Sequence, residues 1–168
     1  MWQELNQLWT SLGDAEYLHL LLEPLPLYGV GFGLVFLLVT HLAGEGKGLL
    51  LSLLLIGASA ASVWPYHHLR EEAMPRVLAT RDTALVPLIQ EQTQRRAAVE
   101  WAYYAVAGVA ALALVARAGG KGRSLITLTL VGGAALFCLS LWLHKKECEV
   151  YHRNIIKYRP PPAAGTGG

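Results

Sequence analysis

Four long apolar stretches are the feature that most constrains the fold of this 168-residue chain. They cover residues 25–42, 49–64, 97–118 and 124–143, and no charge lies near the centre of any of them. Each is about as long as the roughly 17–25 residues that a helix needs to cross the hydrocarbon core of a bilayer. Backbone polar groups in lipid must be satisfied internally, so each stretch should form a helix. The sequence therefore predicts an all-α, integral membrane four-helix bundle.

The composition agrees with a membrane protein and argues against other classes. Hydrophobic residues make up 54% and charged residues 15% of the chain, and the mean hydropathy is +0.37, which is more apolar than a typical soluble domain. The net charge of +2 comes without a basic cluster beyond ordinary membrane flanks, so no nucleic-acid partner is expected. We expect one membrane domain over residues 1–158 and a disordered tail, rich in Pro, Gly and Ala, at 159–168.

Two segments outside the spans also have helical character. Asp14 is placed to cap an N-terminal helix, and Trp2 and Trp9 are typical anchors in the headgroup region. Between the second and third spans lies a long polar segment, 66–96, whose second half, 84–96, has apolar residues spaced for one helical face. We therefore expect an interfacial helix before the first span and a helical loop between the second and third spans.

The two remaining connectors, 43–48 and 119–123, are short and glycine-rich, which makes the spans that they join antiparallel. We call the membrane face with these connectors side A, and the opposite face, with both termini and the segment 66–96, side B. Side B carries ten of the fourteen Lys and Arg residues, so the positive-inside rule favours side B, and both termini, in the cytoplasm. Side B also carries eleven of the twelve acids, and the basic residues of side A are more densely spaced, so the opposite orientation stays open.

Small residues one helical turn apart occur in the spans, and Gly29 and Gly33 form a GxxxG pair in the first. Such residues let helix backbones approach closely, which matters in lipid because no hydrophobic force drives helices together there. The pair fits either homodimerisation through the first span or packing within one bundle. Packing within the bundle is favoured, because small residues at this spacing are a general packing pattern.

Histidines gather on side B, and three of them are candidate haem ligands. His67 and His68 follow the second span and His144 follows the fourth, so their depths match. Two histidines on facing helices can ligate haem iron axially, which makes haem b a candidate cofactor. The alternative is ordinary interfacial composition, since paired histidines before Leu-Arg-Glu-Glu are unremarkable at a helix end. The sequence has no CxxCH motif, which excludes covalent haem attachment of that kind.

Two ExxH pairs on side B are candidates for a metal site, Glu16 with His19 and Glu149 with His152. Residues three apart on a helix share a face, so each pair offers one ion a carboxylate and an imidazole. Glu100, about one turn inside the third span, together with Glu71 or Glu72, would complete a ligand set like that of di-iron carboxylate bundles. Iron is therefore a second candidate cofactor. Alternatively, these are ordinary hydrated residues at the membrane interface and bind no metal. Glu100 could likewise reach the interface or pair with a nearby cation.

Several motifs follow one another along the chain. The first span is entered through His-Leu-Leu-Leu-Glu-Pro-Leu-Pro-Leu-Tyr-Gly at 19–29, Pro65 and Tyr66 follow the second span, Leu-Ile-Gln-Glu-Gln at 88–92 precedes the third, and Val-Tyr-His-Arg-Asn-Ile at 150–155 follows the fourth. With these motifs the chain resembles an uncharacterised family of small bacterial four-span membrane proteins, a domain-of-unknown-function group. The family pattern opens on His-Leu-Leu-Leu-Asn-His-x-Pro and closes on Ile-Arg-His-x-x-Ile.

The resemblance implies a multi-pass protein of the bacterial inner membrane and lends the chain no established activity. His19 and His152 match the histidines of the family pattern. Pro24 and Gln92 stand where the family has two further histidines. Any site built from the family's histidines would therefore lack part of its ligand set in this chain.

Two functions of different classes follow from the sequence. Phosphate-loop, GxSxG and HExxH motifs are absent, so a non-catalytic role is favoured over an enzyme. The first candidate is an accessory or structural subunit of an inner-membrane complex, with the lipid bilayer and other membrane subunits, or a second copy of the chain, as partners. The alternative is a membrane redox module that holds haem or a metal in a His- and Glu-rich rim on side B.

Overall fold

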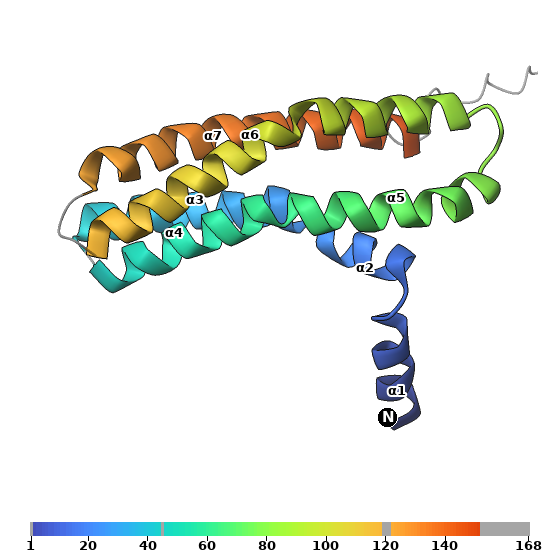
Figure 1. Ribbon diagram of the computed structural model, residues 1–168, viewed down its shortest axis with the longest axis horizontal. Coiled ribbons are helices and arrows are strands. Elements are labelled where there is room, and N and C mark those ends of the chain that lie inside the picture. Colours follow the sequence, from blue (N-terminus) through green and yellow to red (C-terminus); the bar gives the residue numbers. More distant parts are fainter. Residues whose placement is uncertain (1, 45, 119–121, 152–168) are drawn as a thin grey trace, which may run out of the picture.

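The computed structural model describes residues 2–44, 46–118 and 122–151, and every regular element within them is a helix (Figure 1). Four of its continuous helical segments are long and apolar enough to cross a membrane, and each predicted span falls in one of them. The predicted all-α four-helix bundle is confirmed. The tail 159–168 lies outside the described residues. In chain order, the elements are α1 (Trp2–Ser11), α2 (Ala15–Leu22), the π-helical turn η1 (Leu25–Gly29), α3 (Val30–Ala43), α4 (Gly46–Ala61), α5 (Val63–Ala79), α6 (Val86–Ala118) and α7 (Arg123–Tyr151).

The bundle itself consists of α3, α4, α6 and α7. α4 packs between α3 and α6, and α7 closes the ring by packing against both α6 and α3. Fully buried side chains such as Leu37, Leu53 and Ile56 meet small residues such as Ala110 at its centre. The short links that join α3 to α4 and α6 to α7 put consecutive helices side by side. At the first of these, Gly44 ends α3 with a φ of 71°, a left-handed conformation that glycine adopts without steric cost.

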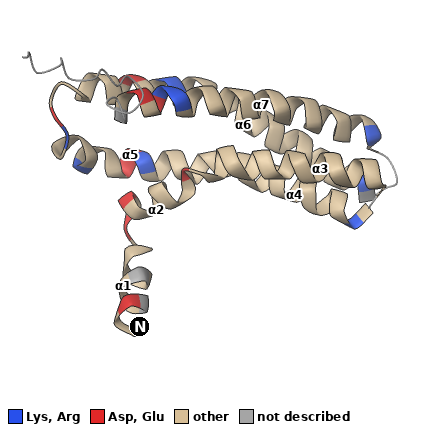
Figure 2. Ribbon diagram, turned by 180° about the vertical axis from the view of Figure 1, so that it is seen from behind, with Lys and Arg blue, Asp and Glu red and all other residues tan. Residues whose placement is uncertain are grey.

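The outer surface of the bundle is also apolar. Phe32, Leu51 and Val115 each expose more than 60% of their surface. A helix that is apolar on all sides is suited to lipid and not to water. Figure 2 shows that the charged residues lie towards the two ends of the bundle and leave its middle uncharged. This uncharged middle is the segment that the bilayer covers.

Three exposed tryptophans, Trp64, Trp101 and Trp142, mark the edge of that segment on side B. At 1.5 Å per residue, the 19 residues from Arg123 to Trp142 on α7 span about 28 Å, close to the roughly 30 Å thickness of a hydrocarbon core. Tryptophan side chains favour this depth because the ring is apolar and its N–H is polar. Arg95 lies over the Trp142 ring, 5.6 Å from its centroid, and adds a cation–π contact at the same level.

The helices extend well beyond this edge. α6 has 33 residues and is therefore about 50 Å long. α5 continues in the direction of α4, with Ser62 between them, so the first part of the polar segment 66–96 is a straight helical extension and not a loop (Figure 1). Pro65 does not interrupt it because it lies in the first turn of α5, where its missing N–H costs no hydrogen bond. We call the four-helix region beyond the tryptophans, made by α2, α5, the start of α6 and the end of α7, the side-B cap.

The chain enters the first span through a bend. Asp14 caps α2, as predicted, by accepting a hydrogen bond from the Glu16 backbone N–H at 2.8 Å. Pro24 and Pro26 then interrupt the α-helical hydrogen bonds, and the chain makes the single π-turn η1 before it continues as α3. Prolines lack the N–H that an α-helix needs at these positions. The bend lets α2 pack against α5 in the side-B cap.

The GxxxG pair of the first span packs inside the bundle. A Cβ atom added to Gly29 would lie 2.1 Å from the Ser59 Oγ, and one added to Gly33 would lie 2.6 Å from the Ile56 Cγ1. Both contacts are with α4, so the two glycines allow α3 and α4 to approach each other. The pair therefore serves packing within one bundle, the interpretation that the sequence favoured.

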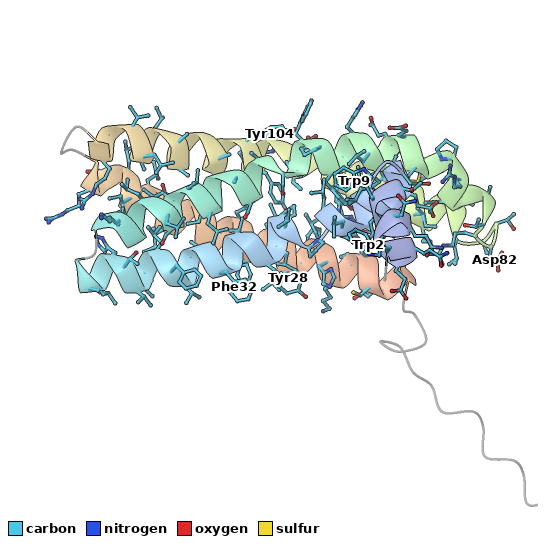
Figure 3. The ribbon with its side chains drawn as sticks, turned by 90° about the horizontal axis from the view of Figure 1, so that it is seen from below. Trp2, Trp9, Tyr28, Phe32, Asp82 and Tyr104 are labelled. Atoms are coloured by element: carbon cyan, nitrogen blue, oxygen red, sulfur yellow. The ribbon has the colours of Figure 1, made fainter. Side chains whose placement is uncertain are left out.

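α1 is separate from the bundle. It runs across the long axis of the bundle and has no extensive contact with it (Figure 1). Trp2 and Trp9 are 82% and 77% exposed, and Figure 3 shows both of them on α1, beneath the side-B cap. A helix that crosses the bundle axis in this way lies parallel to the membrane plane when the bundle spans the bilayer.

Candidate functional site

A cluster of charged side chains lies inside the side-B cap. Arg70 on α5 donates a hydrogen bond from Nη1 to the Glu147 Oε1 on α7 at 3.0 Å. Arg96 on α6 donates from Nε and Nη2 to the two oxygens of the same carboxylate. The exposed fractions of the side chains are 7% for Arg70, 11% for Arg96 and 5% for Glu147. One buried carboxylate therefore binds two guanidinium groups from two different helices.

Tyr66 forms one wall of this cluster. It is 1% exposed, and its hydroxyl accepts a hydrogen bond from the Arg70 Nη1. The Cζ atoms of Arg70 and Arg96 lie 5.9 and 5.2 Å from the centroid of its ring. The electron-rich face of an aromatic ring attracts cations at such distances. Tyr66 thus helps to hold two like charges together in a place that water hardly reaches.

The cluster contains more positive than negative charge. Arginine stays protonated in proteins, so two cations share one carboxylate and the buried group has an excess of one positive charge. Removing an ion from water costs several kcal/mol. Within the described residues, the side-chain hydrogen bonds of Arg70 come from Nη1 and those of Arg96 from Nε and Nη2, so each guanidinium keeps donors for a further acceptor.

A cavity of about 460 Å³ lies against this cluster. Ligand pockets commonly have about 300–1,000 Å³. The lining has a polar part, which contains the cluster, and an apolar part from η1 and the outer half of α5. The lining residues are Glu16, His19, Leu20, Glu23, Pro24, Pro26, Leu27, Tyr28, Tyr66, Arg70, Met74, Val77, Arg81, Arg96, Tyr103, Ser140, His144, Glu147 and Cys148.

One end of the cavity lies near the membrane edge, beside Tyr28. Tyr28 lines it and is also 53% exposed, and Figure 3 shows Tyr28 beside the lipid-facing Phe32 on the outer surface. Gly29 lies against Ser59, so Tyr28 is close to the level of Ser59. Ser59 precedes Trp64 by five residues, which puts Tyr28 roughly 7 Å deeper in the membrane than Trp64. Arg70 lies six residues, or roughly 9 Å, beyond Trp64 on the other side. The cavity therefore joins the acyl-chain level to the headgroup level.

The second wall of the cavity belongs to α2 and the residues that follow it. His19 lies with its ring 6.2 Å from the Tyr66 ring, and its Nδ1 is buried without a hydrogen-bond partner. Glu23 lines the cavity, and its carboxylate has no hydrogen bond or ion pair within the described part of the chain. This wall thus supplies an imidazole and a carboxylate that are available to a ligand.

An ion-pair group fixes α2 onto α5 at the outer end of the cavity. The Arg76 Nη1 lies 2.9 Å from the Asp14 Oδ2 and 3.5 Å from the Glu16 Oε2. The hydrogen bond from Arg76 holds the pKa of the Asp14 carboxyl below its usual range. All three side chains are partly exposed, so water weakens these pairs relative to the buried cluster. They join α2 to α5 without forming part of the buried cluster.

The structure does not bring the three candidate haem ligands together. His144 lines the cavity, and its Nε2 lies 3.6 Å from the Cys148 Sγ. His68 is exposed and stacks on Trp64, whereas the His67 Nδ1 lies 3.6 Å from the Glu71 Oε1. The buried face of α5 carries Tyr66 and Arg70, so neither His67 nor His68 belongs to the cavity lining.

The candidate metal ligands are also spread over different places. Glu16 and His19 both line the cavity, as their spacing on one helix face predicts. Glu100 accepts a hydrogen bond from the Tyr104 hydroxyl, and Glu149 accepts one from the Lys146 Nζ at 3.0 Å. His152 lies outside the described residues. Among the residues that are described, no three His, Cys, Asp or Glu side chains are grouped so that they could hold a metal ion.

The Arg70–Arg96–Glu147 cluster has no distinct signature in the local sequence. Each member has the composition of an ordinary interfacial charge, and Glu147 lies 77 positions from Arg70 and 51 from Arg96. A signal was present in the spacing of α5, where Tyr66, Arg70 and Ala73 share one face. An arginine on the same helical face as an aromatic and a small residue indicates burial. This signal applies only if the segment is a helix, and its prolines and charges favour a loop instead.

Comparisons of the chain with known proteins identify no relative. No family model matches the chain, and no curated protein or solved structure matches it either. The resemblance to the uncharacterised four-span family stays a prediction.

Proposed function

We propose that this chain is a membrane binding protein that holds the anionic group of an amphiphile in the cavity of the side-B cap. The observation that carries the proposal is the excess of one buried positive charge on the cavity wall, where Arg70 and Arg96 share Glu147. A phosphate or carboxylate group would accept hydrogen bonds from the guanidinium donors that Glu147 leaves available, and hydrogen bonds to charged groups are the strong ones. The buried charge then has a function beyond holding helices together.

The surroundings of the charge favour an amphiphile over a small hydrophilic ion. The cavity has an apolar part lined by Pro26, Leu27 and Tyr28 at the acyl-chain level, where the Tyr28 side chain is also 53% exposed. A molecule with an anionic head and a hydrocarbon tail fits both parts at once. A small ion would leave the apolar part of the cavity without a partner.

The proposal is tested by counting the lipids that stay bound after purification in mild detergent, with native mass spectrometry as the readout. The test variant is Arg70→Gln, which leaves Arg96 and Glu147 as a neutral pair and removes the excess charge. We expect the occupancy of bound amphiphile to fall about tenfold, because a charge-assisted hydrogen bond contributes about 1.5–3 kcal/mol. The control is Arg95→Gln, which removes the arginine next to Arg96 on α6; Arg95 pairs with Glu91, and neither residue lines the cavity.

Equal occupancy in Arg70→Gln and in the wild type would contradict the proposal. Loss in Arg95→Gln to the same extent would also contradict it, because the effect would then follow the general positive charge of side B and not the cavity. The tryptophan fluorescence and the melting temperature of each variant, measured in the same detergent, show whether the fold is kept.

The accessory or structural subunit predicted from the sequence is a second candidate. The observation that favours it is α1, which stands apart from the bundle and exposes Trp2 and Trp9. Such a helix offers an apolar face either to the bilayer surface or to another subunit. We place the protein in a bacterial inner membrane, with side B in the cytoplasm, on the family resemblance and on the positive-inside count.

A further inference from the structure

We infer that the amphiphile is a zwitterionic aminophospholipid, whose phosphate binds Arg70 and Arg96 and whose ammonium group binds Glu23. This inference rests on the proposed function and names the ligand of the same cavity. Its basis is the distribution of charge on the two walls: the α5–α6 wall carries the excess guanidinium charge, and the α2 wall carries a carboxylate with no ion pair within the described residues.

The lining as a whole is electrically balanced. It contains three arginines and three glutamates, at positions 70, 81, 96, 16, 23 and 147. A purely anionic ligand would use the positive wall and place its negative charge in the same small cavity as Glu23, where the low dielectric strengthens repulsion. A ligand with one positive and one negative group matches both walls. Zwitterionic headgroups have this pattern of charge.

Glu23 is the carboxylate best placed for the ammonium group. Glu147 is saturated by two arginines, and Glu16 lies 3.5 Å from Arg76. Glu23 follows α2 directly, beside Pro24, and is half-buried in the lining. A primary ammonium group has three donors and hydrogen-bonds a carboxylate, whereas a quaternary ammonium group has no N–H to donate. The cavity should therefore separate ethanolamine from choline headgroups.

The depth of the cavity fits a lipid that remains in the bilayer. Arg70 and Tyr28 are separated by about 16 Å along the bundle axis, as estimated from the residue levels of α4 and α5. The interfacial region of a bilayer occupies about 5–7 Å on each side of the hydrocarbon core. Arg70 lies roughly 9 Å beyond the tryptophan level, so a headgroup bound there would be raised by a few Å while its acyl chains leave beside Tyr28 within the bilayer.

The test is a native mass spectrometry titration of the full chain in mild detergent. The probes are short-chain phosphatidylethanolamine, phosphatidylcholine and phosphatidylglycerol, with free phosphoethanolamine to separate a lipid from a soluble headgroup. We expect the wild type to bind the ethanolamine lipid about tenfold more tightly than the glycerol and choline lipids. Glu23→Gln should remove this preference, whereas Glu72→Gln, a change at an exposed glutamate outside the lining, should keep it.

The possible outcomes separate the two proposals. Binding of phosphatidylglycerol as tight as that of phosphatidylethanolamine, with loss in Arg70→Gln, would overturn the zwitterionic ligand and leave the proposed function intact. Free phosphoethanolamine bound as tightly as the lipid would overturn the lipid as the ligand. Binding of every probe that is unaffected by Arg70→Gln would overturn both proposals.

Discussion

The loss of Glu147 should destabilise the buried cluster more than the loss of either arginine that it binds. Its carboxylate is the one negative charge in the buried cluster, and it accepts hydrogen bonds from α5 and α6 at once. Without it, two guanidinium groups would face each other across the Tyr66 ring with no counter-charge. Without Arg70, by contrast, a neutral pair with good hydrogen-bond geometry remains. The two residues are therefore unequal in their effect on stability.

We predict that Glu147→Gln destabilises the protein by about 3–5 kcal/mol, the cost of leaving buried charges without their partner. Arg70→Gln should cost clearly less. The measurement is chemical denaturation of the detergent-solubilised protein. Arg76→Gln serves as a reference for an exposed pair, which contributes about 0–1 kcal/mol. A larger loss in Arg70→Gln than in Glu147→Gln would show that the carboxylate does not hold the cluster together.

At the scale of the elements, α3 packs closely against α4 at Gly33. Gly33 lies directly against Ile56, and no side chain larger than hydrogen fits without a shift of one helix. Gly108 on α6 is a contrasting case, because an added Cβ would meet nothing within 4 Å. The same residue type thus has a packing role on one helix and none on another.

We predict opposite effects for the same substitution at these two positions. Gly33→Ala should destabilise the bundle by about 1–3 kcal/mol, the usual cost of overpacking. Gly108→Ala should be neutral or stabilise it by up to about 1 kcal/mol, because alanine favours the helix more than glycine does. Thermal unfolding in detergent, followed by circular dichroism, measures both. Equal melting temperatures for the two variants would contradict the α3–α4 contact described above.

The elements differ in how far the sequence predicts them. The spans follow directly from apolar runs, and the α2 cap follows from Asp14, because both depend on neighbouring residues alone. α5 was not predicted, since Pro65 and Pro75 and the charges of residues 66–82 suggest a loop. Pairing with α2 stabilises this segment as a helix and cannot be read from local sequence, and the shared face of Tyr66 and Arg70 indicates burial only once the helix is recognised. The buried cluster requires three helices at once, so it needs the tertiary structure.

At the scale of the whole molecule, the bundle and α1 are oriented differently relative to the bilayer. The bundle crosses it, and α1 runs across the bundle axis near the side-B cap (Figure 1). Trp2 and Trp9 are seven residues apart, about two helical turns, and so lie on one face. An amphipathic helix in this position binds the headgroup region with its apolar face.

We predict that a photo-crosslinking amino acid at position 9 labels lipid in native membranes. The control position is 39 on α3, where Val39 is 56% exposed on the outer face of the bundle and should also label lipid. A discrete protein adduct of fixed mass from position 9, absent from position 39, would contradict the lipid-bound position of α1. It would support the accessory-subunit candidate instead.

The shared carboxylate also has a consequence for how the chain is made. Arg70 and Arg96 leave the ribosome before Glu147, which follows 77 and 51 residues later. At about 5–20 residues per second, the two cations wait roughly 3–15 s for their counter-charge. During that time the two guanidinium groups have no counter-charge, which disfavours their burial between α5 and α6. We therefore expect the side-B cap to close last, once Glu147 near the end of α7 has been made.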